Sequence, residues 1–271
     1  MASSSSRDGG SPWKKHSCRS SGEPPEEKQL RNWEDLPWEV TASIFSRLMA
    51  TEILMRVQFV CKPWFDICKD PLLWRRINVV NDREAAVGRL CRHAVDRSCG
   101  GLLDINIDYF GTDDLLEYIT DRCVQIKRLR LARCYHVSDA GLNNAITKLP
   151  LLEELDLSLC TFSKEPLKAA GRCCPRLQSL KLNRQGRIPC FVDPNEGLEV
   201  NENAFAIANH MPELRHLQLL GDRMNETGLQ AILDGCSHLE SLDLRHCHGI
   251  ELKGKLKKRC IEQIKSLQLP H

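Results

Sequence analysis

A pattern of aliphatic residues, L-x-x-L-x-L, recurs seven times in the C-terminal two thirds of the chain. Its middle residues are 24 to 26 residues apart, apart from one interval of 37, and they are Ile105, Leu129, Leu155, Leu180, Leu217, Leu242 and Leu267. A fixed period of this length is typical of a solenoid, in which each repeat buries its aliphatic residues only by stacking on its neighbours. The pattern therefore predicts a solenoid of about seven repeats over residues 102–271.

Half of the fourteen cysteines occupy two fixed positions in these repeats. Three of them, Cys134, Cys160 and Cys247, lie three residues after the last aliphatic residue of the pattern. Four others lie three or four residues before the next copy of the pattern: Cys123, Cys174, Cys236 and Cys260. The period and the cysteine after the strand resemble leucine-rich repeats of the cysteine-containing type. That resemblance implies an α/β solenoid in which each repeat is a short parallel strand, a loop and a helix, with about seven strands. It also implies a horseshoe with its strands on the concave side, and thiols that pack at turns and helix ends.

The composition and the N-terminal segment restrict the expected cellular location of the protein and the classes of partner that it should bind. Net charge is +2, which gives no overall field favouring nucleic acid or an anionic membrane as a partner. The first residues, MASSSSRDGGSP, lack the apolar segment of a signal peptide, and no eighteen apolar residues are consecutive. We therefore expect the protein in the nucleus and/or cytoplasm, where reducing conditions keep cysteines free of disulfides.

Residues 1–32 are rich in Ser, Gly, Pro and charged residues, which predicts a disordered tail. Residues 33–77 carry apolar residues at helical spacing and predict a compact unit of about three short helices. The segments LPWEV, IFSRL, VQFVCKPW and DPLLW of this unit resemble, in order, an F-box. An F-box followed by such repeats resembles the F-box/LRR substrate receptors, and NWEDLPWEV is similar to the plant SKIP-like group.

The F-box resemblance implies docking on a Skp adaptor and, through it, on the cullin and RING subunits of an SCF-type ubiquitin ligase. A unit of about 45 residues is too small to bury all of its large apolar side chains, so several should face a partner. About half of the following candidates are expected to be core instead: Trp33, Leu36, Pro37, Phe45, Leu48, Leu54, Val57, Cys61, Trp64 and Trp74. Residues 78–101, with Val87, Leu90, Cys91 and Ala94 at helical spacing, should form a linker helix that caps the first repeat.

Side chains that alternate with the strand leucines should line the concave wall. Their charges alternate from strand to strand, and the spacing places Asp104, Arg128 and Glu154 side by side. A parallel row holds Arg130, Asp156 and Lys181. One interpretation is self-neutralisation that keeps the wall soluble. The other is contact with a protein substrate at the less charged end, through His216, Gln218 and Leu220.

The interval of 37 residues contains an insertion near residues 184–200, with Ile188, Phe191 and Val192 between turn-forming residues. A long loop in a regular repeat is often functional, so these three residues are further candidates for substrate contact. The alternative is a loop that folds over the helices.

No motif in the sequence favours a catalytic, metal or cofactor site. His246-Cys247-His248 and Cys173-Cys174 lack a second ligand pair at zinc-finger spacing, and no glycine-rich loop of phosphate-binding spacing is present. A cysteine nucleophile would need a positioned base, and nothing singles one out. We therefore expect a substrate-recognition subunit that is not an enzyme. The alternative is a scaffold that binds a Skp adaptor without directing degradation.

Overall fold

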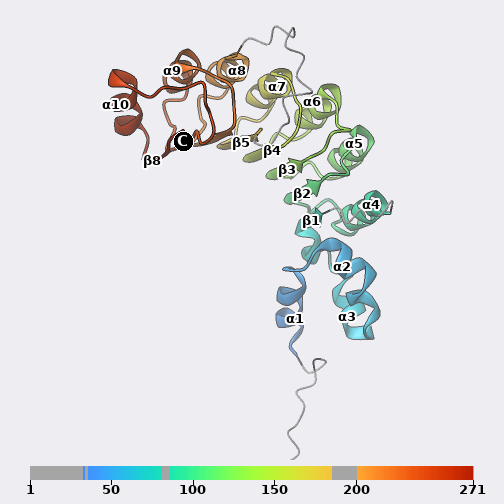
Figure 1. The fold of residues 1–271 in the computed structure, drawn as a ribbon. Coiled ribbons are helices and arrows are strands. Elements are labelled where there is room, and N and C mark those ends of the chain that lie inside the picture. Colours follow the sequence, from blue (N-terminus) through green and yellow to red (C-terminus); the bar gives the residue numbers. More distant parts are fainter. Residues whose placement is uncertain (1–32, 34–35, 81–85, 185–199, 271) are drawn as a thin grey trace, which may run out of the picture. The chain divides into compact units, whose positions relative to one another are not determined.

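One open sheet of eight parallel strands runs through the repeats of the computed structural model, which describes residues 33, 36–80, 86–184 and 200–270 (Figure 1). The strands follow one another in chain order without a crossover. They are β1 Arg76–Val80, β2 Asp104–Asp108, β3 Arg128–Ala132, β4 Glu154–Ser158, β5 Ser179–Asn183, β6 His216–Leu220, β7 Ser241–Asp243 and β8 Ser266–Gln268. The predicted solenoid is thus confirmed, with β1 as a strand beyond the seven predicted.

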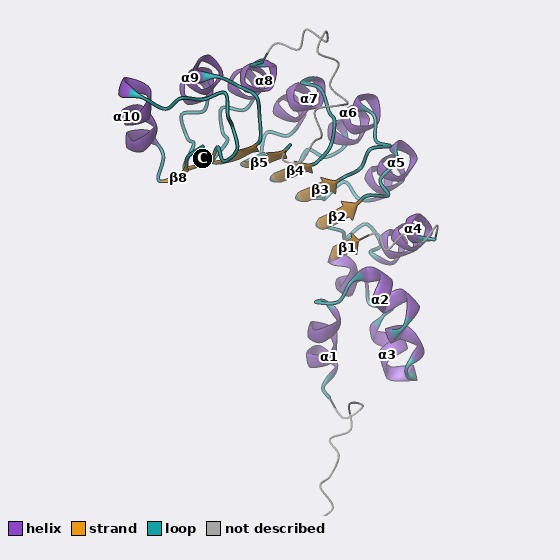
Figure 2. Cartoon of the chain, viewed as in Figure 1, coloured by secondary structure: helices purple, strands orange, loops and turns teal. Residues whose placement is uncertain are grey.

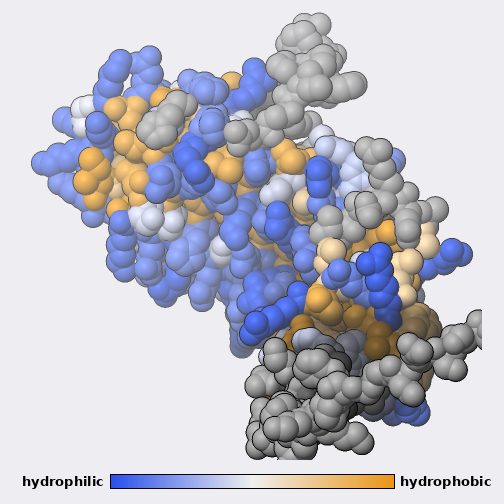
Figure 3. Space-filling model, turned by 60° about the horizontal axis from the view of Figure 1, so that its bottom comes forward, coloured by the Kyte–Doolittle hydropathy of each residue, from blue (hydrophilic) through white to orange (hydrophobic). Residues whose placement is uncertain are grey.

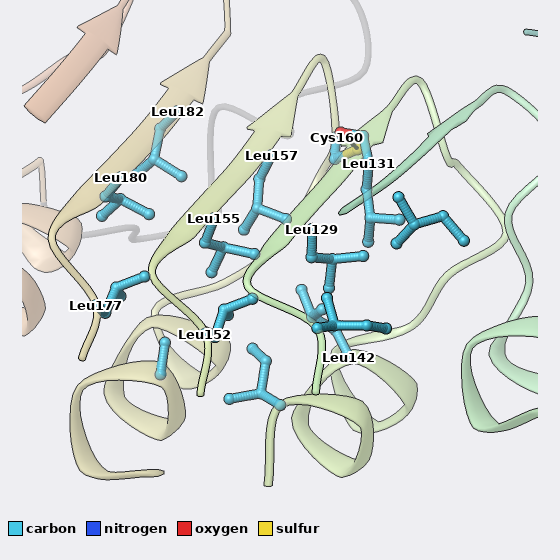
Figure 4. Packing of buried hydrophobic residues seen from close by; sticks show 14 of the residues in the cluster. Leu129, Leu131, Leu142, Leu152, Leu155, Leu157, Cys160, Leu177, Leu180 and Leu182 are labelled. Carbon is cyan, nitrogen blue, oxygen red and sulfur yellow. Dashed lines mark hydrogen bonds between the residues drawn. The ribbon is translucent and has the colours of Figure 1, made fainter. Parts of the chain in front are cut away.

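The strand leucines lie in register across the sheet. Leu129 on β3 pairs with Leu155 on β4, which pairs with Leu180 on β5. These side chains point into the layer between the sheet and the helices, where they are almost completely buried (Figure 4). Each such side chain contributes about 1.5–3 kcal/mol of transfer free energy. Because a leucine meets its counterparts only on the neighbouring repeats, this contribution depends on stacking.

The repeat helices all lie on one side of the sheet (Figure 2). They are α5 Asp113–Arg122, α6 Asp139–Thr147, α7 Glu165–Cys173, α8 Glu202–His210, α9 Glu226–Gly235 and α10 Gly254–Gln263. Ser138 caps α6, because its hydroxyl accepts a hydrogen bond from the backbone N–H of Gly141 at 3.0 Å. The hydroxyl of Ser138 also donates to Asp113 of the preceding helix at 2.6 Å, so the cap joins two repeats.

The residues that directly follow β2, β3 and β4 take the left-handed backbone conformation. Their φ angles are 81° at Tyr109, 52° at Arg133 and 58° at Leu159. A left-handed conformation costs an ordinary residue about 1–2 kcal/mol. In return, the N–H of Arg133 donates to the carbonyl of Ser158 at 2.9 Å, and the N–H of Leu159 donates to that of Asn183 at 2.6 Å. These bonds lengthen the strand ladder by one residue at the point where the chain turns.

The repeat cysteines lie where the sequence predicted them. Each thiol after a strand donates to a carbonyl of the preceding strand: Cys134 to Ile107 at 3.5 Å, Cys160 to Leu131 at 3.5 Å, and Cys247 to Leu219 at 2.8 Å. The thiols at the helix ends are buried too: Cys123, Cys174, Cys236 and Cys260. Within the described ranges the cysteines are free. Their role is to tie a turn or a helix end to the neighbouring repeat.

The N-terminal helical unit contains α1 Trp38–Phe45, α2 Ala50–Met55 and α3 Lys62–Ile67, with 3₁₀ helices η2 Val57–Phe59 and η3 Pro71–Arg75. Trp74 fills its centre, 1% exposed, and its indole N–H donates to the carbonyl of Cys68 at 2.9 Å. The predicted linker helix is α4, Val87–Arg97, and it packs against α2 and β1. Arg97 donates to Gln58 at 2.8 Å and to the carbonyl of Cys68 at 3.1 Å, so it fixes α4 to the helical unit.

The chain divides after Asp35, and the residues from Leu36 onward form one unit. The predicted tail, residues 1–32, and most of the predicted insertion lie outside the described residues. Among the helices that are described, none has the length and apolar character to cross a membrane.

Candidate functional sites

An apolar surface covers the N-terminal helical unit. Figure 3 shows hydrophobic residues gathered at the lower right, where this unit comes forward. The exposed large apolar side chains between residues 36 and 80 are Trp38, Val40, Ile44, Met49, Met55, Phe59, Val60 and Leu72. Phe59 is 72% exposed, which is unusual for a phenylalanine in a folded unit. A cluster of this kind is typical of a protein-binding surface. We call these eight residues the apolar surface.

The candidate adaptor residues divide into core and surface. Phe45, Leu54 and Trp74 are buried, so their assignment as contact residues is corrected to core. Phe45 also packs edge-on against Trp64, with their ring centroids 5.0 Å apart. The partly buried candidates are Leu36, Leu48, Val57, Cys61 and Trp64, and the exposed ones are Trp33 and Pro37.

Sequence reasoning missed the residues of the apolar surface themselves. Trp38 and Ile44 lie on α1, whose buried residues are Thr41 and Phe45. A helix of two turns has too few residues for periodicity to separate its two faces. Trp38 lies within the LPWEV segment, which was the one signal that could have drawn attention to it.

The concave face carries the predicted charge rows. Asp104, Arg128 and Glu154 occupy matching positions on β2, β3 and β4, and Arg128 pairs with Asp104 at 2.8 Å. In the second row, Arg130 lies 3.4 Å from Asp156. Lys181 pairs diagonally with Glu154. The hydrogen bond that Arg128 donates to the carboxylate of Asp104 is the main reason why the pKa of Arg128 is raised. Within each of these three ion pairs the opposite charges neutralise each other. The concave face is largely hydrophilic (Figure 3).

The predicted substrate residues on β6 differ in accessibility. His216 is exposed, and Gln218 is partly buried and donates to Asp243 at 3.2 Å. Leu220 is only 8% exposed, so it belongs to the core rather than to a contact surface. The loop candidates Ile188, Phe191 and Val192 lie outside the described residues. Contact between β6 and a substrate remains a prediction.

A polar pocket of about 380 Å³ opens where the concave face meets the N-terminal helical unit. One wall is the segment Ser46–Leu48, which follows α1, and the floor comes from the first five strands. Its charged lining residues are Arg47, Arg76, Asp104, Arg128, Arg130, Glu154, Asp156 and Lys181. We call this the junction pocket. The sequence pattern does not predict this pocket, because its wall and its floor are far apart in the chain.

Three buried thiols of the repeats are poor nucleophiles. Burial raises the pKa of Cys160 and of Cys174 to about 12, and that of Cys247 to about 11. Thiolate is the reactive form, and at such pKa values it is scarce near neutral pH. Among the described residues, no three His, Cys, Asp or Glu side chains lie close enough together to hold a metal ion.

Two family models and several curated proteins match the chain. An F-box-like model matches residues 33–79, and a Leucine Rich repeat model matches residues 235–254. "F-box protein SKIP19" of Arabidopsis thaliana is 48% identical over 260 residues, which are 93% of this chain and 82% of that protein. The chain belongs to the F-box/LRR-repeat family. Its helical unit is therefore an F-box, and the sheet is a run of leucine-rich repeats.

A second relative extends beyond the region that this chain matches. "Putative F-box/LRR-repeat protein 23" of Arabidopsis thaliana is 52% identical over 250 residues, and the chain covers 55% of its length. Among solved structures, one titled "Crystal structure of Rad7 and Elc1 complex in yeast" has a TM-score of 0.53 at 15% identity. That match covers 87% of this chain and 60% of the other, and it shows that the F-box/LRR chain shares its fold.

Proposed function

We propose that this chain is the substrate-recognition subunit of an SCF-type E3 ubiquitin ligase. The F-box binds a Skp adaptor, which joins the chain to the cullin and RING subunits, and the leucine-rich repeats bind the target protein. The chain performs no chemistry in this proposal. It raises the effective concentration of target lysines near the ubiquitin-carrying enzyme held elsewhere in the complex. We place this complex in the nucleus or the cytoplasm.

The apolar surface of the F-box is the observation that supports the proposal most directly. Eight large apolar side chains are exposed there, while Trp74, Phe45 and Leu54 already supply a core. Trp38 is of a residue type that dominates binding energies when a partner desolvates it, at about 2 kcal/mol or more. Phe59 is a second large aromatic side chain, a class that contributes strongly to interface energetics. A partner that covers this surface would remove a large apolar area from water.

Capture of a recombinant Skp adaptor by the immobilised full chain tests the proposal. We expect Phe59→Ser to lower capture by about tenfold or more, because it removes an exposed anchor without opening the core. The double variant Leu36→Ala and Pro37→Ser, at the start of α1, should also lower capture. Its thermal unfolding should be recorded, because Leu36 is partly buried.

Ile261→Ser is the matched control. Ile261 is 60% exposed on α10 and is not part of the apolar surface, so this variant should capture the adaptor as the wild type does. Equal capture by Phe59→Ser and Ile261→Ser would contradict adaptor binding through the F-box. Degradation is tested separately: depletion of the chain should lengthen the half-life of a captured target, and an unchanged half-life would favour the scaffold.

A further inference from the structure

The junction pocket holds more positive than negative charge. Its lining includes four arginines and a lysine but only three carboxylates. Each carboxylate already has a partner: Asp104 pairs with Arg128, Asp156 with Arg130, and Glu154 with Lys181. Arg47 and Arg76 form no ion pair with any residue that the structure describes. Two guanidinium groups therefore line the pocket with their charge uncompensated by the described part of the chain.

The positions of these two arginines suit a ligand that lies across the pocket. Arg47 belongs to the wall contributed by the F-box, and Arg76 begins β1 on the floor. Both residues are exposed, so a ligand can reach them. A guanidinium group binds a carboxylate through two parallel hydrogen bonds, a geometry that lysine lacks.

An amide pair beside the arginines adds a neutral polar contact. Asn106 on β2 donates to the side-chain oxygen of Asn78 on β1 at 2.7 Å. The side-chain oxygen of Asn106 is buried and accepts no hydrogen bond from the described residues. A buried acceptor without a donor is unfavourable, so a ligand that supplies an N–H to this amide would be favoured. Backbone N–H groups of a peptide are donors of this kind.

We propose that the junction pocket binds an acidic segment of the target protein, an extended peptide with aspartate or glutamate side chains. Arg47 and Arg76 bind its carboxylates, and the amides of Asn78 and Asn106 bind its backbone. The segment continues along the polar concave face beyond the pocket. This inference rests on the proposed function, because it names the class of substrate that the repeats recognise. It places recognition beside the F-box, on β1 to β5, whereas His216 lies on the next strand, β6.

Fluorescence anisotropy with the purified full chain tests the proposal. The probe is a fluorescein-labelled ten-residue peptide of alternating glutamate and glycine, and its partner peptide has glutamine in place of each glutamate. We expect the glutamate peptide to bind and the glutamine peptide to bind at least about tenfold more weakly. Raising the salt concentration should weaken binding of the glutamate peptide, because partly exposed charges are screened. Equal binding of the two peptides would overturn the proposal.

The double variant Arg47→Gln and Arg76→Gln should weaken binding of the glutamate peptide by about tenfold or more, because two charge-assisted contacts are lost. The double variant Lys255→Gln and Lys257→Gln is the matched control. It removes the same net charge from the exposed face of α10, and it should leave peptide binding unchanged. An equal loss in both double variants would show nonspecific attraction and would overturn the proposal.

Two further measurements distinguish the alternatives. Inorganic phosphate that displaces the glutamate peptide at equal concentration would assign the pocket to small anions and overturn the peptide proposal. Capture of the Skp adaptor is measured in the same samples. Failure of peptide binding with adaptor capture intact overturns this inference alone, whereas failure of adaptor capture with peptide binding intact overturns the proposed function alone.

Discussion

Buried thiols in the repeats behave as packing groups, because they are removed from water and five of them donate to a backbone carbonyl of a neighbouring repeat. Cys174, at the end of α7, donates to the carbonyl of Leu149 at 3.4 Å. Desolvation is the main cause that raises its pKa to about 12. Because this thiol bonds to a carbonyl that precedes its own repeat, it connects two neighbouring repeats.

We predict that Cys174 in the native protein will resist iodoacetamide at pH 8, because a raised pKa leaves almost no thiolate at that pH. Cys99, which is exposed, should be alkylated within the same incubation. Site-resolved mass spectrometry of the alkylated chain measures both. In a denaturant both residues should react. Rapid alkylation of Cys174 in the folded protein would show that the α7 terminus opens readily.

The repeat pattern correctly predicts which cysteines are buried. In the F-box, helical spacing does not predict which apolar residues are exposed. Cys134 and Cys160 follow the last strand leucine at a fixed distance, so the register of the strands determines their burial. In the F-box no such register exists. Phe45 and Ile44 are adjacent on α1, yet the first is buried and the second is exposed, and the short helices leave that choice to tertiary packing.

At the scale of elements, the spacing between neighbouring helices depends on glycine. Gly235 ends α9, and a side chain there would place its first carbon 2.2 Å from the carbonyl oxygen of Ala208 on α8. That oxygen is backbone, so it cannot move without moving the helix. The neighbouring helices α8 and α9 can therefore approach closely only because this position carries no side chain.

We predict that Gly235→Ala will lower the free energy of unfolding by about 1–3 kcal/mol, the range for overpacking a close contact. Gly88→Ala on α4 is the control. A side chain at Gly88 meets no atom within 4 Å, and alanine favours a helix by about 1 kcal/mol over glycine, so this variant should be slightly stabilised. Urea unfolding followed by circular dichroism measures both. Equal stability of the two variants would contradict the close approach of α8 and α9.

The sequence predicted the repeating elements but missed the first strand. In β1, Ile77 and Val79 are buried and lie opposite Ile105 and Ile107, so the strand continues the aliphatic rows. The segment carries only part of the repeat pattern, and it directly follows the last F-box motif, so the prediction placed it at a domain boundary. Pairing with β2, a contact distant in sequence, makes it a strand.

At the scale of the whole described unit, β1 and α4 join the F-box to the repeats. The hydrophobic core continues through this junction, and Trp74, Ile77 and Ile105 belong to one cluster of buried residues. A receptor of the proposed kind needs such continuity, because a flexible joint would spread the target over a large volume and lower its effective concentration near the ligase. The junction pocket takes its wall from the F-box and its floor from the strands, so a bound acidic segment would contact both parts at once.

Arg97 is the polar part of that joint, and its removal gives a test. It donates to the carbonyl of Cys68 and to Gln58, and its guanidinium lies 5.5 Å from the ring centre of Trp74. We predict that Arg97→Met, which keeps much of the apolar stem, will lower the free energy of unfolding by about 1.5–3 kcal/mol, as expected for lost hydrogen bonds to a charged group. Hydrogen exchange should then rise in α2 and α3 while the central strands β3 to β5 stay protected.

Arg245→Met removes an exposed arginine that pairs with Asp243 on β7, and exchange in the F-box should not change in this control. Exchange that rises equally in α3 and in β4 would mean that Arg97 stabilises the unit as a whole, and it would remove the reason to treat this arginine as the link that holds the F-box against the repeats.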